Sequence, residues 1–273
     1  MLHRLKIGSD YYSRLPESQK KLVNEYPDTV EKIKSCIIHN SELISKVLRN
    51  ISSNIFDDHP FSFDQGKAIN GTDKEASIIN NPYGVTSGDM DKVRSTLKQF
   101  VRDWSSEGQA ERDSCYKPVL NELVDIYKEK DRSTLHILVP GAGLGRLAWE
   151  IAHLGFNCQG NEFSLHMLLP AYFILNSCRN IDSYTLYPWV SQSCNILSRK
   201  DQLASVRFPD VSPSDLPKNI QFSMAAGDFL EVYSEKGLVL IFLVLIFSDY
   251  ICSIPFPLQV PLILLCDSMA HKT

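Results

Sequence analysis

The stretch Leu135–Arg146, which reads LHILVPGAGLGR, is the most informative part of this sequence for its fold. Its apolar first half predicts a β-strand over Leu135–Val139, and the pattern of Leu147–Ala152 predicts a helix directly after the glycines. A strand that turns sharply through glycines into a helix lets backbone N–H groups approach a ligand closely. Glu162 ends the next predicted strand, where an acidic side chain can bind the two hydroxyls of a ribose. The stretch therefore predicts an α/β fold with a nucleoside-cofactor site.

The spacing of the glycines distinguishes between two kinds of cofactor. Dinucleotide-binding folds use G-x-G-x-x-G, whereas Gly141, Gly143 and Gly145 form G-x-G-x-G. Arg146 stands where the dinucleotide pattern has its last glycine, and its long side chain is expected to crowd a pyrophosphate. This disfavours a nicotinamide dehydrogenase, and G-x-G-x-G is typical of methyltransferases that use S-adenosylmethionine. A tight strand–helix turn without any ligand remains the alternative.

A third predicted strand, Phe222–Ala226, ends in Gly227, Asp228 and Phe229. Ligands of a doubly wound sheet lie at the carboxyl ends of its strands. There, Asp228 can accept a hydrogen bond from the amino group of an adenine, and Phe229 can cover the ring. The alternative is that Asp228 only caps the following helix. The residues alone leave both interpretations open.

Composition and charge exclude several classes of function. The chain has 273 residues, 44% of them hydrophobic and 22% charged, which suits one globular domain with an extension. Its net charge of −4 gives no basic field for nucleic acid. The seven cysteines form no C-x-x-C pair and no cluster with histidine, so no metal site is predicted. The thiols are expected to be reduced, in the cytoplasm or also the nucleus, and the amino terminus lacks the apolar core of a signal peptide.

The periodicity divides the chain into four segments. The stretch from Glu17 to Arg49 is amphipathic at helical spacing, and Pro27 is expected to split it into two helices. Further helices are predicted over Met90–Trp104 and Glu111–Lys128. The apolar face of the first stretch consists of Leu22, Val23, Val30, Ile33, Ile37, Leu43, Ile44 and Val47. The predicted division is a helical extension at 1–58, a flexible loop at 59–88, the S-adenosylmethionine-binding core at 89–237 and an apolar tail at 238–273.

Residues that typically end, cap or interrupt helices predict further details of the core. The helix after the glycine loop is expected to end at Gly155, and Ser164 is expected to cap the next helix. Pro170 falls inside that helix and is expected to bend or interrupt it. Tyr184–Asn219 is predicted to be a long irregular insertion, either a lid or substrate wall or an inert surface excursion.

Several unusual segments between Tyr11 and Glu235 together resemble the carnosine N-methyltransferase family. The resemblance is much more specific than a glycine loop alone, because the matching segments are long. They are Ser95–Trp104, Glu111–Tyr116, Val139–Glu150, Gln159–Ser164, Leu186–Trp189 and Ala226–Phe229, with a weaker match at Arg14–Pro16.

This resemblance implies a class I methyltransferase fold, with a doubly wound Rossmann-like sheet and a helical amino-terminal extension. It also implies a set of S-adenosylmethionine contacts. Gln99 and Arg102 are three residues apart on a predicted helix and so share a face, and a guanidinium fork suits the carboxylate of the methionine moiety. Spacing alone favours an ordinary surface ion pair for Arg102. The implied contacts are Gln99, Arg102, Gly141, Glu162, Asp228 and Phe229, which Gly143 and Gly145 join as members of the glycine loop.

The implied activity is transfer of a methyl group from S-adenosylmethionine to an imidazole nitrogen of carnosine, which gives anserine. The competing hypothesis is a non-catalytic remnant that binds the cofactor. The expected partner is a small imidazole-containing dipeptide, and a homodimer is left open, whereas neither nucleic acid nor a membrane is expected. No catalytic base is assigned.

The resemblance is expected to end after Glu235, so that the sheet is incomplete at the C-terminus and the family's substrate motifs are missing. This pattern is expected of a truncated or alternatively spliced product or a faulty gene model. The apolar run Leu238–Phe247 is too short to span a bilayer and is predicted to be a buried strand in the fourth place of the sheet. Joined to Ile251–Cys266 it approaches spanning length, but Asp249 and three prolines interrupt it, so a membrane anchor is the less favoured alternative.

Overall fold

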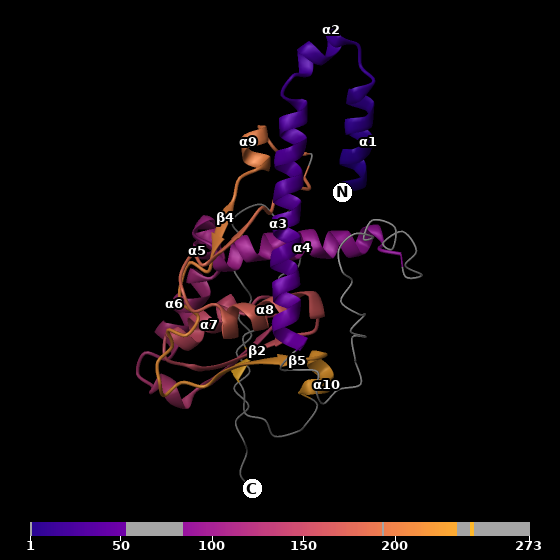
Figure 1. Cartoon of the computed structure of the whole chain (residues 1–273). Coiled ribbons are helices and arrows are strands. Elements are labelled where there is room, and N and C mark those ends of the chain that lie inside the picture. Colours follow the sequence, from indigo (N-terminus) through magenta and orange to yellow (C-terminus); the bar gives the residue numbers. More distant parts are fainter. Residues whose placement is uncertain (1, 53–83, 193, 234–240, 243–273) are drawn as a thin grey trace. The chain divides into compact units, whose positions relative to one another are not determined.

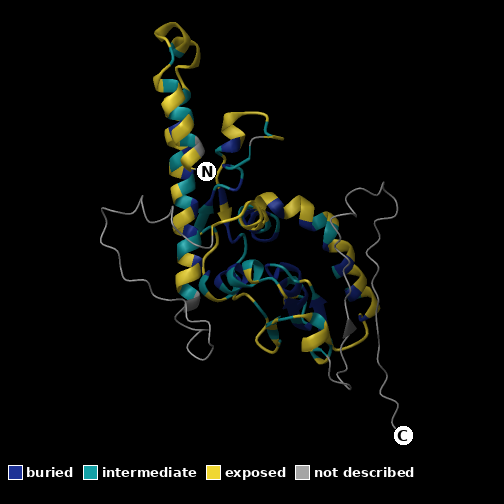
Figure 2. Cartoon of the chain, turned by 90° about the vertical axis from the view of Figure 1, so that its right-hand side faces the viewer, coloured by how far each residue is buried: buried dark blue, intermediate teal, exposed yellow. Residues whose placement is uncertain are grey.

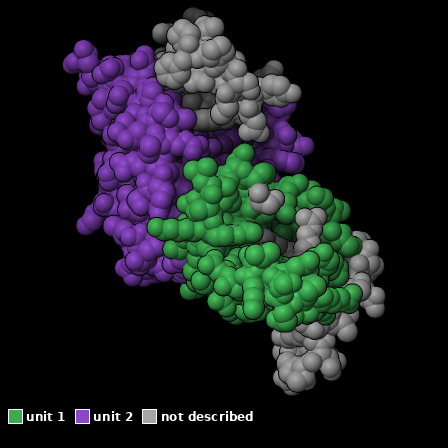
Figure 3. All heavy atoms as spheres, turned by 90° about the horizontal axis from the view of Figure 1, so that it is seen from above, with its two compact units in different colours: residues 1–98, 186–205 green, residues 99–185, 206–273 purple. Residues whose placement is uncertain are grey.

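The computed structural model describes residues 2–52, 84–192, 194–233 and 241–242 (Figure 1). Two compact units can be distinguished, and they are coloured separately in Figure 3. The first comprises Met1–Lys98 with Leu186–Ser205, and the second comprises Gln99–Thr185 with Val206–Thr273. The predicted loop at 59–88 lies outside the described residues up to residue 83, and most of the predicted tail at 238–273 does too. The predicted domain boundaries therefore stay predictions.

The first unit is built on helices. They are α1 (Leu2–Ser13), α2 (Glu17–Lys20), the short η1 (Lys21–Val23), α3 (Tyr26–Ser52) and α9 (Arg199–Gln202), with the first part of α4 (Ser87–Trp104). Pro27 is the second residue of α3, where proline is tolerated, so the predicted division at Pro27 is confirmed. Figure 2 shows buried and exposed residues alternating along α3. The prediction that Leu22 and Val23 belong to the apolar face is wrong: they are 83% and 45% exposed, because they lie in the separate turn before α3.

The segment Leu186–Ser205 is fixed to α3 within this unit. The side chain of Asn40 donates to the carbonyl of Tyr187 at 2.9 Å and accepts from the N–H of Tyr187 at 2.9 Å. Val190 packs with Ile33 and Cys36 of α3. The predicted irregular insertion at Tyr184–Asn219 is corrected in part, because it contains α9, β3 (Tyr184–Leu186) and β4 (Val206–Phe208).

Helix α4 (Ser87–Trp104) begins in the first unit and ends in the second. It starts three residues before the predicted Met90, because Thr86 and Asp89 form a reciprocal cap: the N–H of Thr86 donates to Asp89, and the N–H of Asp89 donates to the Thr86 hydroxyl. The turn η2 (Ser106–Gly108) follows. The helix predicted over Glu111–Lys128 is instead two helices, α5 (Gln109–Cys115) and α6 (Lys117–Ile126). Pro118 is the second residue of α6, in the first turn, where proline is tolerated.

The second unit contains a parallel sheet. Its strands are β1 (His136–Pro140), preceded by η3 (Arg132–Thr134), and β2 (Asn157–Glu162), β5 (Phe222–Ala226) and β6 (Ile241–Phe242), in the order β5-β2-β1-β6. The register pairs His136 with Asn157, Cys158 with Phe222, and Ile137 with Ile241. The chain thus steps outward from β1 to β2 and β5, and then returns to the other side of β1. The predicted fourth strand is confirmed at Ile241 and Phe242, and the rest of Leu238–Phe247 lies outside the described residues.

Helices α7 (Arg146–His153), α8 (Leu165–Ser177) and α10 (Phe229–Val232) follow β1, β2 and β5. Gly155 has a φ of +95° just after α7, as predicted for a helix end. Ser164 occupies the cap position of α8 without a side-chain cap bond, so its predicted capping bond is wrong. Of the expected bend or interruption at Pro170, the interruption is wrong, because α8 runs through Pro170 with this part of the helix buried. Burial of the neighbouring Phe173 and Ile174 offsets the proline's cost of about 3 kcal/mol.

None of the helices that the structure describes has the length and apolar character needed to cross a membrane.

Candidate functional site

The loop after β1 requires its three glycines for their backbone conformation. Gly141, Gly143 and Gly145 have φ values of +65°, +57° and +80°, which L side chains rarely adopt. Among the residues that the structure describes, none has an atom within 4 Å of a Cβ atom built on Gly141, so these residues leave the loop open to a ligand at this point. A Cβ at Gly145 would lie 3.3 Å from Leu175 Cδ1 and from Met224 Sδ, so this glycine also permits close packing. The loop is thus a cradle whose face at Gly141 is left free by the described part of the chain.

Glu162, at the end of β2, is held against this loop. Its Oε2 accepts from the N–H of Gly143 at 2.9 Å, and its Oε1 accepts from Phe163 and Ser164 at 2.9 and 2.8 Å. Three backbone donors fix the orientation of the carboxylate of Glu162, a residue that is only 9% exposed. The predicted neighbours Glu162 and the glycine loop therefore do lie together.

Asn161, which the sequence analysis does not single out, joins β2 to the end of β5. Its carbonyl accepts from the N–H of Ala142 at 2.9 Å, and its side chain donates to the carbonyls of Ala225 and Gly227 at 3.3 and 3.2 Å. The N–H of Gly227 in turn donates to the carbonyl of Glu162 at 3.1 Å. The loop tips after β1, β2 and β5 are thus connected in one hydrogen-bond network, as the sequence predicts.

Gly160 explains how closely these elements approach one another. A Cβ atom there would lie 2.4 Å from Met224 Sδ and 2.8 Å from Ala142 Cβ. Any side chain at this position would push β2 away from the glycine loop and from β5. The glycine directly before Asn161 is a signal in the sequence that could have revealed this contact.

Asp228 and Phe229 lie at the outer end of the same network. Asp228 is exposed, and its Oδ1 accepts from the N–H of Leu230 at 2.8 Å, which caps α10. The structure therefore shows the capping interaction that the sequence leaves open, and contact with adenine stays a prediction. The ring of Phe229 lies 5.3 Å from that of Tyr233, whose hydroxyl donates to Gln159 at 2.7 Å.

Arg102 and its neighbour Asp103 form an ion pair at the end of α4. The Nε of Arg102 donates to Asp103 Oδ1 at 2.8 Å, and Nη2 donates to Oδ2 at 3.4 Å. The Asp103 side chain is 1% exposed and that of Arg102 is 27% exposed, so this is not the surface ion pair considered as the alternative. Burial is the largest single influence and would lower the pKa of Arg102, but the charge and hydrogen bonds of Asp103 together with the nearby Tyr116 and Glu111 outweigh it and raise that pKa. Gln99, one turn earlier on α4, is half-buried.

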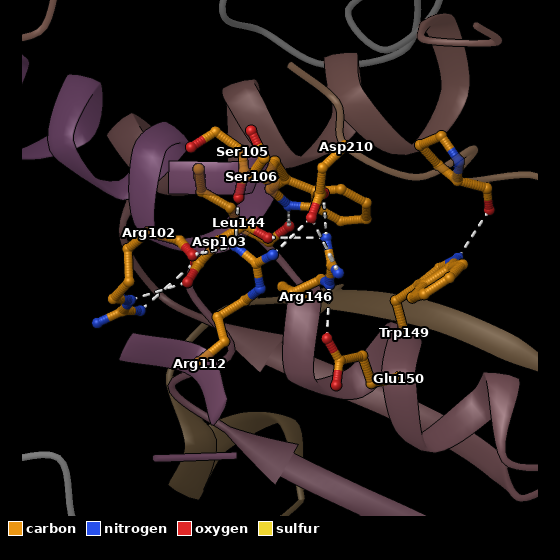
Figure 4. A network of polar contacts seen from close by, with 12 residues as sticks. Arg102, Asp103, Ser105, Ser106, Arg112, Leu144, Arg146, Trp149, Glu150 and Asp210 are labelled. Atoms are coloured by element: carbon orange, nitrogen blue, oxygen red, sulfur yellow. Dashed lines mark hydrogen bonds and ion pairs between the residues drawn. The ribbon is translucent and has the colours of Figure 1, made fainter. Parts of the chain in front are cut away.

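The C-terminal end of α4 contacts the glycine loop and the helix after it (Figure 4). The indole N–H of Trp104 donates to the carbonyl of Leu144 at 3.0 Å. Nη1 of Arg146 donates to the carbonyl of Asp103 at 3.0 Å, and Nη1 of Arg112 donates to the carbonyls of Arg102 and Ser105 at 2.6 and 2.8 Å. Two cations therefore satisfy carbonyl groups that a helix end leaves without partners, at the negative end of the helix dipole.

Asp210 neutralises both of these arginines. Figure 4 shows Arg112 and Arg146 approaching its carboxylate from two sides, and Arg146 also pairs with Glu150 at 2.8 Å. Burial lowers the pKa of Arg112, and the nearby charge of Arg146 acts in the same direction. Burial would also lower the pKa of Arg146, but the hydrogen bonds and charges of Asp210 and Glu150 together outweigh it and raise that pKa. The expectation that the Arg146 side chain would crowd a pyrophosphate at this loop is corrected: the side chain is 6% exposed and is held in this cluster.

Within the part of the chain that the structure describes, no three His, Cys, Asp or Glu side chains are grouped so that they could hold a metal ion. The site as described consists of a glycine cradle, a fixed carboxylate, a half-buried guanidinium and an exposed aspartate. These groups can bind a ligand with ribose hydroxyls and a carboxylate.

Comparison with known proteins identifies relatives over most of the chain. A family model described as Carnosine N-methyltransferase matches residues 80–251. The Rattus norvegicus protein named carnosine N-methyltransferase is 47% identical over 237 residues, which is 86% of this chain and 56% of the relative. The Drosophila melanogaster protein named carnosine N-methyltransferase unmet is 40% identical over 257 residues (86% and 53%), and a Dictyostelium discoideum protein named carnosine N-methyltransferase is 37% identical over 245 residues (86% and 51%).

The chain spans about half the length of the curated relatives that it matches. The family match extends through residue 251, so the prediction that the resemblance ends at Glu235 is wrong. The physical reason is visible in the sheet, where Ile241 and Phe242 form the strand that pairs with β1.

Proposed function

We propose that this chain, which belongs to the carnosine N-methyltransferase family, binds S-adenosylmethionine and methylates an imidazole nitrogen of carnosine. The observation that carries the proposal is the hydrogen-bond network that joins the glycine loop, Glu162 and the Gly227–Asp228 tip at one edge of a parallel sheet. The strand order reverses at β1, and ligands of open α/β sheets bind at such a reversal. We interpret the sheet as part of a doubly wound class I methyltransferase sheet.

The residues of the site fit S-adenosylmethionine from one end to the other. The open face at Gly141 leaves room for a ligand that approaches the backbone closely. Glu162 would accept from the ribose hydroxyls, Arg102 with Gln99 would bind the methionine carboxylate, and Asp228 with Phe229 would receive the adenine. When bound, the cofactor supplies an electrophilic methyl group on a sulfonium.

The chain's own residues contribute to the reaction by holding the cofactor and by orienting its donor group toward the acceptor. Fixing a donor group against an acceptor contributes to rate through proximity and alignment, provided that the bound geometry is maintained. The three backbone bonds to Glu162 and the buried partner of Arg102 provide such fixed contacts at two points of the ligand. An imidazole acceptor has to present an unprotonated nitrogen, which a neutral histidine ring does near physiological pH.

A second candidate is a protein that binds S-adenosylmethionine without turnover. The observation that favours it is that every site residue named above accounts for the cofactor and none for the imidazole. A cytosolic or nuclear location, supported by free thiols at Cys36, Cys115, Cys158, Cys178 and Cys194, is part of both versions of the proposal.

The test is to incubate the purified chain with S-adenosylmethionine labelled in the methyl group and with carnosine, and to measure binding by calorimetry in parallel. Labelled anserine together with binding supports the enzyme, binding without product supports the second candidate, and absence of binding contradicts both.

Glu162→Ala is expected to weaken S-adenosylmethionine binding by about 100-fold, because an anion that accepts from two hydroxyls is lost. The matched control is Glu122→Ala, which removes an exposed carboxylate of α6 and is expected to leave the affinity unchanged. An unchanged affinity of the Glu162 variant would remove Glu162 from the site.

A further inference from the structure

The ion pair of Arg102 and Asp103 is unusual in how deeply its anion is buried. The Asp103 carboxylate accepts from Arg102 at 2.8 and 3.4 Å and from the hydroxyl of Tyr116 at 2.9 Å, and its side chain is 1% exposed. A buried carboxylate is costly unless it is paired and hydrogen-bonded, so these contacts must be maintained in the folded protein. The position of the Asp103 carboxylate is therefore fixed. Of the two side chains in this ion pair, that of Arg102, at 27% exposure, is the one that reaches the surface.

The position of Asp103 relative to the glycine loop links this pair to the site. A Cβ atom built on Gly143 would lie 3.9 Å from Asp103 Oδ2, so the carboxylate lies beside the middle glycine of the loop. The main chain at this point is fixed as well, because Arg112 donates to the carbonyl of Arg102 and Arg146 to that of Asp103. Both the backbone that carries Arg102 and the anion that orients its guanidinium are thus held against the loop.

From this geometry we propose that Asp103 is a positioning residue, which orients the guanidinium of Arg102 toward the α-carboxylate of the bound cofactor. Because Asp103 is buried, it acts through Arg102 and does not touch the ligand. A planar guanidinium binds a carboxylate well only in a fixed orientation, so an Arg102 side chain without Asp103 would lose rotational freedom on binding and bind more weakly. The inference rests on the proposed function and specifies how one end of its cofactor is recognised.

The experiment compares two ligands that differ only at the end in question. S-adenosylhomocysteine carries the amino-acid end with its α-carboxylate, and 5′-methylthioadenosine lacks it. Asp103→Asn is expected to weaken binding of S-adenosylhomocysteine about tenfold and that of 5′-methylthioadenosine less than about twofold, since a charge-assisted contact is weakened at one end only. In an Arg102→Ala background, Asp103→Asn is expected to have little further effect on S-adenosylhomocysteine, because coupled residues are not additive.

A second variant keeps the test decisive should Asp103→Asn fail to fold. Tyr116→Phe removes one donor to Asp103, and Tyr127→Phe alters another buried tyrosine of the same core as a matched control. Tyr116→Phe is expected to weaken S-adenosylhomocysteine selectively, and Tyr127→Phe is expected to affect neither ligand.

The outcomes separate this inference from the proposed function. If the wild type binds S-adenosylhomocysteine but the Asp103 and Tyr116 variants bind it as tightly, or lose both ligands equally, Asp103 has no positioning role and the inference is overturned. Additive losses in the Arg102→Ala background overturn it too. If the wild type binds neither ligand, the proposed function itself fails, and this inference with it.

Discussion

The two ends of the candidate site are built in different ways. At the α4 end, Arg102 is oriented by a buried carboxylate, and the backbone below it is bound by two buried arginines. At the β5 end, Asp228 is exposed, and its tip is held by an amide side chain and backbone bonds. The first end depends on paired charges in a low dielectric, whereas the second depends mainly on amide and backbone hydrogen bonds, with one exposed carboxylate that caps α10. One ligand can thus be bound at the α4 end by a fixed ion pair and at the β5 end by a residue that also caps a helix.

The largest expected effect comes from removing the carboxylate of Asp210, the anion that Arg112 and Arg146 share at the α4 end. Asp210→Ala leaves Arg112 and Arg146 buried without this anion, and the free energy of unfolding is expected to fall by about 3–5 kcal/mol. Urea denaturation followed by circular dichroism measures this loss. Asp215→Ala, an exposed position on the same connection, is expected to change stability by less than about 0.5 kcal/mol. Equal losses in the two variants would show that the charge cluster is not what stabilises this end.

The hydrogen bonds that hold the β5 end can be removed by substituting Asn161. Asn161→Ala removes the donors to Ala225 and Gly227, and the expected cost is about 2 kcal/mol of unfolding free energy. Affinities for S-adenosylhomocysteine and 5′-methylthioadenosine are expected to fall together, in contrast to Asp103→Asn, because the displaced tip belongs to the adenosine end.

Asn157 provides the matched control for that variant. It bridges β2 to Gln221 and Ser133 at the opposite end of the same strand. Asn157→Ala is expected to cost comparable stability and to leave both affinities unchanged. If it weakened binding as much as Asn161→Ala does, the effect would reflect loss of the sheet and not of the tip.

Stability measured at a series of pH values tests the burial of Tyr116, which donates to Asp103 at the α4 end. Burial, and then the charge of Asp103, raise the pKa of Tyr116 well above its ordinary value of 10.0. A raised pKa means that the folded state keeps the phenol protonated, so its contribution to stability is complete below pH 10 and is lost as the pH rises above it. The stability difference between the wild type and Tyr116→Phe is expected to fall by about 1.4 kcal/mol per pH unit in that range. Parallel stability curves of the two proteins between about pH 9 and about pH 11 would contradict a buried, neutral Tyr116.

The smallest effect is expected at Asp228, where two roles can be separated. Asp228→Ala removes the cap of the four-residue helix α10 and is expected to cost about 1 kcal/mol or less. Asp228→Ser keeps a good cap but loses the carboxylate. If Asp228 also accepts from the adenine, both variants lose affinity for 5′-methylthioadenosine. Retained affinity in Asp228→Ser alone would assign Asp228 to capping only.

The parts of the fold that could be predicted are those whose signals are local. The strand before Gly141, the helix after Gly145 and the end of that helix at Gly155 are each marked by an apolar run or by glycine. The convergence of the tips after β1, β2 and β5 also follows from sequence, because parallel strands place their carboxyl ends at one edge.

The partners of buried charges could not be predicted, because they come from distant parts of the chain. From the sequence, Arg146 is expected to crowd a ligand at the loop. Asp210 lies in the predicted insertion, and only the tertiary structure brings it to the guanidinium of Arg146. Asp103 looks like any acidic residue of an amphipathic helix until Tyr116 and Gly143 are seen beside it. The path of α8 through Pro170 likewise depends on packing that outweighs a local preference.

The central position of β1 has a consequence for synthesis of the chain on the ribosome. One neighbour of β1, β2, follows after a single short helix, but the other, β6, is translated only around residues 241 and 242. During the whole interval, one side of an apolar strand has its N–H and C=O groups open to any extended peptide nearby. Chaperone contact and nascent-chain aggregation are therefore expected to concentrate at Ile137–Val139 until that last partner emerges.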